Sequence, residues 1–174
     1  MTKILIVFSH SDFAQSRINK AMLEAIDELE NVTIHILEES APNFKFDVEK
    51  EQALLVQFDV IVLQFPMYWF GSPALLKHWI DEVFLYGFAY GSTGNSLKDK
   101  TLVCATTAGG EAVDFTPDGA YGYSVKEFYR PFEITAKFCK MGYAEPFSIY
   151  DSANVTDDEL VTFAADYRRW LANI

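Results

Sequence analysis

The sequence predicts an α/β fold in which a five-stranded parallel sheet lies between two layers of helices, a three-layer sandwich. Continuous apolar runs at residues 4–8, 60–63 and 102–105 are typical of strands that are buried on both faces. Segments with helical periodicity alternate with such runs along the whole chain. A length of 174 residues, with no repeat or Pro/Gly-rich linker, predicts a single domain spanning residues 1–174.

The first half of the chain contains two predicted strands, a third strand-like segment and three helices. A helical stripe over residues 18–29 follows the first apolar run, and residues 32–36 alternate like a strand nearer the edge of the sheet. Residues 47–58 are helix-like and precede the second apolar run. A further helical stripe over residues 75–84 begins behind Pro73, because proline is favoured in the first turn of a helix.

The second half completes the alternation. Residues 125–129 predict a short helical turn, and Pro131 is expected to open a helix that runs to Lys140. Residues 147–149 predict the last strand, and the capping-box pattern of residues 156–159 starts a final helix through Trp170. Five strands in this sequence suit the flavodoxin-like order 2-1-3-4-5, in which ligands bind beyond the carboxyl ends of the strands.

Composition excludes several classes of function. A formal net charge of −11 argues against nucleic acid and anionic membranes as partners. No apolar run reaches the roughly 18–20 residues of a transmembrane helix, and the first residues do not resemble a secretion signal. Cys104 and Cys139 lack CxxC spacing and are expected to be buried thiols in a reducing cytoplasm, and no metal site is expected.

Three loops after predicted strands carry the chemistry. The first, residues 9–19, offers hydroxyls, His10, Arg17 and the free N–H groups of a helix start, which together suit a phosphate. It contains neither the dinucleotide nor the P-loop fingerprint. An ordinary connection, with Ser16 as a helix N-cap, explains the same composition.

The second and third loops are unusual in other ways. Residues 64–73 gather aromatic side chains and two prolines, which favours a stacking partner or a protein interface over a solvated surface. A hydrophobic loop packed on its own helix is the alternative. Residues 106–111 contain paired glycines, which let a backbone approach a ligand closely, although a simple turn also uses them. An anion pocket, an aromatic wall and a row of amide donors are what FMN, or the FMN half of FAD, requires.

At these residues the sequence resembles the NAD(P)H:quinone oxidoreductases of the flavodoxin-like superfamily, in particular the short bacterial general stress protein 14-like reductases and potassium-efflux ancillary subunits. The most specific stretch is residues 65–84, followed by Gly-Phe-Ala-Tyr-Gly at residues 87–91. Thr-Thr-Ala-Gly-Gly at residues 106–110 and Arg-Pro-Phe-Glu at residues 130–133 also match.

The resemblance, together with the loop composition, implies a site residue by residue. Residues of the first loop would hold the flavin phosphate, those of the second the ring, and those of the third its polar edge. The expected cofactor-binding residues are His10, Ser16, Arg17, Ile18, Asn19, Pro66, Met67, Tyr68, Trp69, Phe70, Thr106, Thr107, Ala108, Gly109 and Gly110. Family members are usually homodimers, so Phe88 and Tyr90 would cover the site of the partner.

One feature departs from the family pattern. Mammalian quinone reductases place a tyrosine and a histidine after the glycine pair as a proposed proton relay, and the nearest positions here are Phe115 and Tyr121. Phe115 lacks a polar atom and is expected only to line the substrate pocket, which leaves Tyr121 as the candidate catalytic proton donor.

The expected function is therefore a flavin-dependent NAD(P)H oxidoreductase that reduces quinone, azo or nitro acceptors by two-electron hydride transfer. FMN is favoured over FAD because the short chain has no evident element to hold an adenosine. NADH and NADPH remain equal candidates. Two alternatives stay open: a flavodoxin-type electron carrier, which the acidic charge fits, and a regulatory ancillary subunit bound to a membrane potassium-efflux transporter.

Overall fold

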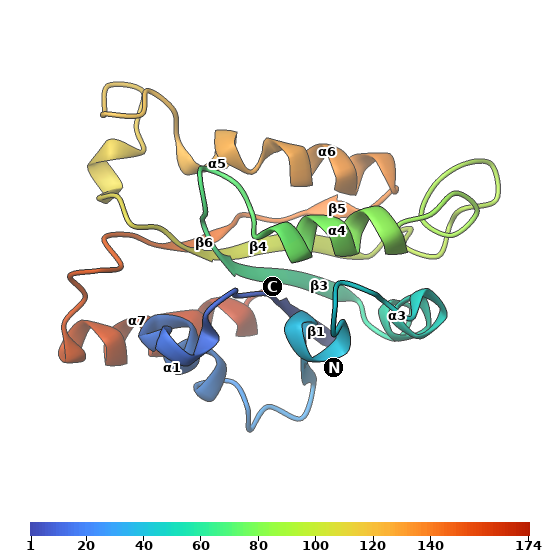
Figure 1. Ribbon diagram of the computed structural model, residues 1–174, viewed down its shortest axis with the longest axis horizontal. Helices are drawn as coiled ribbons and strands as arrows, with labels where there is room; N and C mark the ends of the chain where they lie inside the picture. Colours follow the sequence, from blue (N-terminus) through green and yellow to red (C-terminus); the bar gives the residue numbers. More distant parts are fainter.

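The computed structural model describes residues 1–174 and has the predicted α/β architecture (Figure 1). The strands of its sheet are β1 (Ile4–Phe8), β2 (Val32–Ile36), β3 (Val60–Pro66), β4 (Thr101–Thr107), β5 (Gly142–Tyr143) and β6 (Phe147–Ile149). The helices are α1 (Arg17–Glu24), α2 (Leu37–Ser40), α3 (Val48–Leu55), α4 (Ala74–Val83), α5 (Val125–Phe128), α6 (Arg130–Phe138) and α7 (Asp157–Ala172), with 3-10 turns η1 (Phe13–Gln15) and η2 (Ala112–Asp114).

All strand pairs of the sheet are parallel, and the order is β2-β1-β3-β4-β5, with β6 also pairing β4. This confirms the predicted order 2-1-3-4-5 and the edge position of β2. The fifth position is shared by two short strands, because residues 144–146 interrupt it with a proline that cannot donate a hydrogen bond to the sheet. The strand expected at residues 147–149 therefore forms as β6, but it pairs with only part of β4, and β5 pairs with another part.

Helices cover both faces of the sheet, as Figure 1 shows for α4 and α6 on one side and α1 and α7 on the other. Alternate residues of each central strand serve the two cores, as the period of two requires. Leu5, Ile61 and Leu102 join the core under α3, α4 and α6. Ile6 and Val62 join the core under α1 and α7. The apolar runs were thus correctly interpreted as strands buried on both faces.

The predicted helices form, with shorter bounds at some ends. The first stops at Glu24 rather than at residue 29, and the second spans Val48–Leu55 within the predicted 47–58. The last begins with the expected capping box, in which Thr156 and Glu159 bond each other's backbone N–H groups. Helix α2 was not predicted. None of the helices combines the length and the hydrophobicity of a membrane-spanning segment.

Candidate functional site

The loops that follow β1, β3, β4 and β6 meet at the carboxyl end of the sheet, where open α/β sheets bind ligands. A cavity of about 410 Å³ lies between them. Its lining is mostly polar and comes from these loops and the strand and helix ends beside them: His10, Asp12, Gln15, Ser16, Arg17, Ile18, Asn19, Pro66, Tyr68, Thr107, Ser152 and Ala153.

A buried polar network supports the floor of this cavity. The Asn19 amide donates to Ser16 Oγ (3.2 Å) and to Thr107 Oγ1 (3.3 Å), and its Oδ1 accepts from Gln64 Nε2 (3.3 Å). The Tyr167 hydroxyl donates to Gln64 Oε1 (2.8 Å). Asn19 and Gln64 are almost completely buried, so each of these bonds replaces one to water. The network joins α1, β3, β4 and α7 directly below the cavity.

This network leaves hydrogen-bond donors facing the cavity. Ser16 and Thr107 each accept from Asn19, so both hydroxyl protons remain free to donate to a ligand. Ser16 occupies the N-cap position of α1, yet its side chain makes no capping bond. The first N–H groups of α1, at Arg17 and Ile18, therefore also stay available, and the helix dipole favours an anion there. Ser16 is therefore the N-cap residue by position, as the alternative interpretation expected, but its side chain does not cap the helix.

His10 adds one further donor. Its Nδ1 accepts the backbone N–H of Asp12 (3.0 Å), which places the ring proton on Nε2 and fixes a neutral tautomer. Burial lowers the pKa of His10 below its ordinary value of 6.5, while the charges of Glu38 and Asp12 oppose that shift. Its ring packs edge-on against Tyr68, 6.2 Å away between centroids. His10 thus acts as a neutral N–H donor at neutral pH.

The His10 pKa predicts a loss of stability in mild acid. Because the folded pKa is depressed, the free energy of unfolding has its full His10 contribution above pH 6.5 and loses it as the pH falls through the folded pKa. Protonation of Nδ1 would also remove the bond from Asp12. We expect urea unfolding at pH 7.5 and 5.5 to show a larger decrease for the wild type than for His10→Asn. Equal decreases in the two proteins would contradict this role of His10.

Two charged side chains hold the first loop in place. Glu38 Oε1 accepts from Ser9 Oγ (2.7 Å) and from the backbone N–H of His10 (2.8 Å), while its Oε2 is buried without a partner. Arg17 donates to the Val155 carbonyl (3.0 Å) and to Asp157 (2.5 Å), so its guanidinium lies at the cavity but shares its charge with α7. The loop is therefore set by long-range contacts before any ligand binds.

The second loop is a tight hairpin in a strained conformation. The backbone N–H groups of Tyr68 and Gly71 each donate to the other residue's carbonyl, both at 3.0 Å. Trp69 and Phe70, the two residues between, have φ angles of 47° and 62°, positions that Asn and Gly usually occupy. Their own N–H groups have no partner within the chain. Strain of this kind persists at functional sites, where it aims particular side chains and amides.

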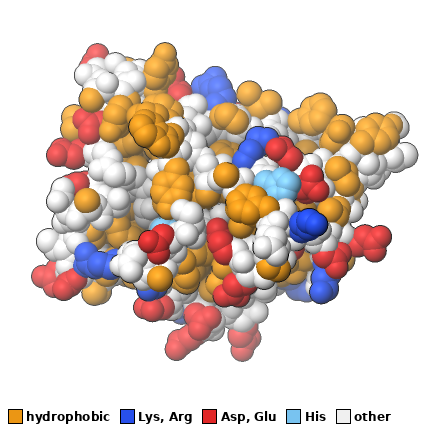
Figure 2. Space-filling view, in the orientation of Figure 1, with side chains coloured by type: hydrophobic (Ala, Val, Ile, Leu, Met, Phe, Trp, Pro, Cys, Tyr) orange, Lys and Arg blue, Asp and Glu red, His pale blue; other side chains and the backbone are white.

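Phe70 anchors the hairpin, whereas Trp69 projects into solvent. Phe70 packs on Tyr121 (5.1 Å between ring centroids) and stacks on Phe128 (5.4 Å). Trp69 is 95% exposed. Figure 2 shows the hydrophobic side chains gathered over this hairpin and α5. An exposed indole beside such a cluster is a free face for a flat ligand.

The third loop supplies unpaired amides. The N–H groups of Gly109 and Gly110 have no partner within the chain, and the space over Gly109 is open. A Cβ at Gly110 would come within 2.6 Å of the Tyr121 hydroxyl, so this glycine lets Tyr121 lie against the loop. Phe115 is buried behind Tyr121, 4.8 Å away between ring centroids. The two positions expected near the substrate are therefore adjacent.

Two of the expected cofactor residues are turned away from the site. Thr106 is fully buried, and its Oγ1 accepts from Tyr129 (2.6 Å) on the α6 side of the sheet. Thr107 points to the opposite face, toward Asn19, because neighbouring residues of a strand alternate. Ala108 is 1% exposed and its backbone pairs with Ile149 and Ser152. The structure thus does not bring Thr106 and Ala108 to the cavity.

The remaining expected residues divide into three groups. One group lines the cavity and consists of the five residues expected from the first loop together with Pro66, Tyr68 and Thr107. A second group lies in or next to the adjacent hairpin and glycine loop: Met67, Trp69, Phe70, Gly109 and Gly110. Phe88 and Tyr90 follow the carboxyl end of α4, which runs back from the hairpin toward the amino-terminal ends of the strands. Within one chain they do not reach the cavity.

Sequence reasoning missed four lining residues: Asp12, Gln15, Ser152 and Ala153. The last two come from the loop after β6. The rule that ligands bind at the carboxyl ends of strands covers that loop as well, so its small polar residues were a usable signal. Asp12 and Gln15 lie within the first loop, but nothing in the sequence distinguishes them from ordinary solvent-exposed polar residues.

Comparison with known proteins agrees with this geometry. The model of the Flavodoxin-like fold family matches residues 2–172. The glutathione-regulated potassium-efflux system ancillary protein KefG of Cronobacter sakazakii is 40% identical over 98% of this chain and 93% of its own.

Two solved structures are also similar. The general stress protein 14 of Treponema denticola, solved in complex with FMN, is 41% identical, covers 98% of both chains and has a TM-score of 0.94. An NADPH-quinone reductase from P. pentosaceus is 32% identical over 99% of both chains, with a TM-score of 0.89. From its match over nearly the whole sequence, the chain belongs to the family with the Flavodoxin-like fold.

Proposed function

We propose that the chain is an FMN-dependent NAD(P)H oxidoreductase acting on quinone-like acceptors. The observation that carries the proposal is the pairing of an anion cavity with the strained hairpin beside it. Free hydroxyl protons of Ser16 and Thr107, the first amides of α1 and the His10 N–H suit a phosphate. The FMN complex of the similar Treponema denticola protein supports this assignment.

The adjacent hairpin and glycine loop fit the rest of the cofactor. Trp69 and Phe70 offer aromatic faces beside the cavity, and the unpaired N–H groups of Gly109 and Gly110 suit the polar edge of the ring. When bound, FMN supplies the ability to accept and donate hydride. Donors near that edge favour the negative charge of its reduced form. No additional element of the chain surrounds the cavity to hold an adenosine, which favours FMN over FAD.

The arrangement also suits the two substrates. With one face of the bound FMN ring held against the protein, its open face would receive a nicotinamide and a quinone-like acceptor in turn, which predicts ping-pong kinetics. The Tyr121 hydroxyl makes no hydrogen bond within the chain and lies against Gly110, so it is the proposed proton donor. The identity with the NADPH-quinone reductase of P. pentosaceus supports this reaction class. Two buried free cysteines fit a reducing cytoplasm as the compartment.

Purification tests the proposal directly. The protein released from its column should carry FMN, identified by absorbance and mass, and should oxidise NADH or NADPH when a quinone is added. A protein that binds no flavin, and that stays inactive after FMN is supplied, would overturn it. Slow NAD(P)H oxidation with fast electron delivery to a protein partner would instead favour the electron carrier.

We further propose a homodimer in which Phe88 and Tyr90 cover the partner's site. The supporting feature is an apolar hollow of about 330 Å³ between α4 and α6, which Tyr90 and Phe138 line. Phe138 is 64% exposed, and Ile134 beside it is 59% exposed. A contiguous apolar surface of this kind is typical of protein interfaces.

The dimer gives a prediction that one substitution can check. Phe138→Glu should weaken association about a hundredfold or more, because it puts a charge in an apolar contact. Sedimentation should then show the mass of one chain, and quinone reduction should fall with it. Val161→Glu is the matched control, since Val161 is 72% exposed on α7, on the other face of the sheet. A wild type that sediments as one chain would contradict the proposal.

A second candidate function rests on the similarity to KefG. A relative named as an ancillary protein of a potassium-efflux system is 40% identical over 98% of this chain. We propose as an alternative that the chain binds a membrane transporter as a soluble subunit, a role that is compatible with the enzyme activity. Co-purification of a transporter from detergent-solubilised membranes would support it, whereas a chain that never sediments with membranes would not.

A further inference from the structure

One arginine stands apart from the other three. Arg17, Arg168 and Arg169 each donate hydrogen bonds to a carboxylate or a carbonyl within the chain. Arg130 makes no side-chain hydrogen bond and no salt bridge, although the chain has a net charge of −11. A planar guanidinium presents five donors in a fixed fork, which suits phosphate. An unused fork on so acidic a protein is a candidate anion contact.

Its nearest carboxylates are already occupied. Glu127 accepts from the backbone N–H of Ser124 (2.8 Å) and from its hydroxyl (2.9 Å) in the capping box of α5. Glu133 accepts from Lys137 Nζ (2.5 Å) one turn along α6. Each carboxylate thus stabilises its own helix, and the exposed Arg130, whose charge helps to lower the pKa of both, donates no hydrogen bond to either.

Arg130 borders a second cavity. This cavity of about 450 Å³ is lined by Tyr123, Glu127, Phe128 and Arg130. Tyr123 is 56% exposed, and its ring lies 6.2 Å from that of Phe128. The cavity therefore combines an exposed aromatic face, which can stack on a purine, with a free guanidinium, which can bind a phosphate.

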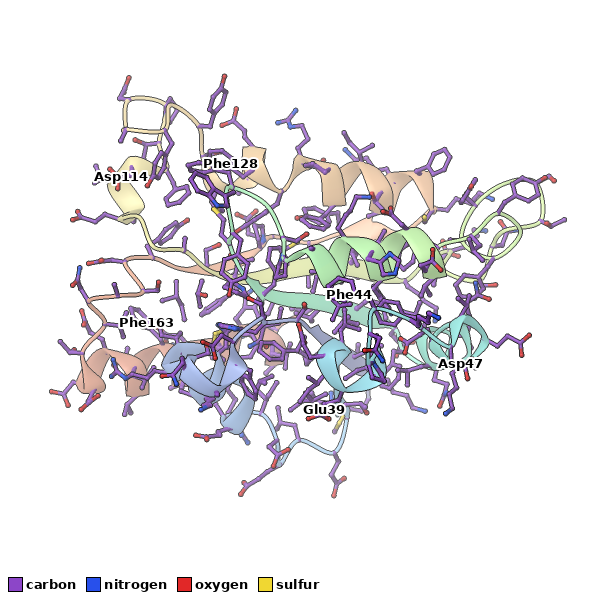
Figure 3. The ribbon with its side chains drawn as sticks, viewed as in Figure 1. Glu39, Phe44, Asp47, Asp114, Phe128 and Phe163 are labelled. Carbon is purple, nitrogen blue, oxygen red and sulfur yellow. The ribbon has the colours of Figure 1, made fainter.

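The second cavity adjoins the hairpin through one shared ring. Phe128 lines it and also stacks on Phe70, at 5.4 Å between centroids with an interplanar angle of 28°. Figure 3 places Phe128 at the end of α5, beside the loop that follows β3. One ring therefore separates this cavity from the hairpin that is proposed to hold the flavin. A nicotinamide nucleotide whose reacting ring faces the flavin would extend its adenosine phosphates beyond that ring, over the neighbouring surface to which this cavity belongs.

We propose that Arg130 and Tyr123 form the subsite for the phosphate-bearing adenosine end of the reduced nicotinamide nucleotide. This subsite rests on the proposed function. It gives a nucleotide contact to Arg130, the first residue of the Arg-Pro-Phe-Glu segment, and to Tyr123 in the loop before α5. Two phosphates could meet the guanidinium, the 2′-phosphate of NADPH and the 5′-diphosphate common to both nucleotides. Both present the same chemistry, and they can be separated with small probes.

Titration calorimetry of FMN-loaded protein with two probes tests the subsite without turnover. We expect Arg130→Gln to weaken binding of adenosine 2′,5′-bisphosphate or of ADP about ten- to a hundredfold. A loss confined to the bisphosphate assigns the 2′-phosphate, and a loss with both probes assigns the 5′-diphosphate. Arg130→Lys should recover part of the affinity, because lysine keeps the charge without the fork.

Lys126→Ala is the matched control. It removes one positive charge from the neighbouring α5, where Lys126 pairs with Glu145. In steady state, Arg130→Gln should raise the KM for the nucleotide and leave kcat and the KM for the quinone unchanged. Equal small effects of Arg130→Gln and Lys126→Ala would overturn the subsite, as would a rise only in the quinone KM. If the wild type neither retains FMN nor oxidises NAD(P)H, the proposed function fails instead, independently of the calorimetry.

Discussion

Asn19→Leu should destabilise the protein by about 2–4 kcal/mol and remove most of its affinity for FMN. Asn19 is 1% exposed and connects Ser16, Thr107 and Gln64. A leucine of similar size would leave the buried Gln64 amide without an acceptor, and each unsatisfied buried group costs about 1–3 kcal/mol. The Ser16 and Thr107 hydroxyls would also lose the donor that orients them, so they would turn away from the cavity.

The other end of the same network provides the control. Tyr167→Phe removes only the bond to Gln64 Oε1 and makes no change at the cavity, so it should cost about 1–2 kcal/mol with little effect on FMN affinity. Denaturant unfolding measures the stability change, and quenching of flavin fluorescence measures the affinity. If Tyr167→Phe weakens FMN binding as much as Asn19→Leu, the hydroxyl orientation does not determine the affinity.

Most of the fold could be predicted from sequence, because the central strands β1, β3 and β4 are buried on both faces and each contains a continuous apolar run. The exceptions have local causes. Helix α2 follows β2 without a break, and its Leu-Glu-Glu-Ser sequence is too short to show helical periodicity. The fifth strand position is divided by Pro146, and β5 before it has only two residues. A segment of two residues carries no pattern of alternation.

The site could be predicted at the level of loops but not of every side chain. Thr106 and Thr107 are identical residues, and only the alternation of β4 sends one to the core and the other to the cavity. The sequence would have separated the two threonines if the predicted strand over residues 102–105 had been continued to residue 107, where β4 ends. The bond between Gln64 and Tyr167 was not available, because the two residues are 103 positions apart and nothing local relates them.

Trp69→Asn should raise stability and lower activity together. Trp69 has a φ of 47° and is 95% exposed, and it makes no aromatic contact within the chain. Its left-handed backbone costs about 1–2 kcal/mol for an ordinary residue and less for asparagine. Since the indole gives almost no packing in return, we expect the free energy of unfolding to increase by about 0.5–1 kcal/mol.

The same substitution removes the proposed stacking face. An aromatic pair is worth about 0.5–1.5 kcal/mol in addition to the apolar area that it buries, and that area adds about 1 kcal/mol. Together these losses predict that FMN affinity or quinone turnover falls about ten- to a hundredfold. Trp69→Phe should keep most of the activity, because it retains an aromatic face. Its free energy of unfolding should stay close to that of the wild type, because phenylalanine relieves none of the backbone strain at this position. Calorimetry of the apoprotein and steady-state assays of the FMN-loaded protein measure the two effects separately.

Phe44→Asn distinguishes strain at a site from strain elsewhere. Phe44 also has a left-handed backbone, with a φ of 58°, and is 54% exposed, but it lies beside His78 and far along the chain from the cavity loops. Its replacement should relieve strain as Trp69→Asn does, reduced by the lost contact with His78, and should leave FMN affinity unchanged. If Trp69→Asn destabilises the apoprotein, the left-handed backbone at residue 69 is not strained. If the variant binds FMN normally, the flavin ring does not stack on Trp69. Higher stability with lower activity at Trp69 alone would show that the hairpin keeps an unfavourable backbone because its side chain is needed for the ligand.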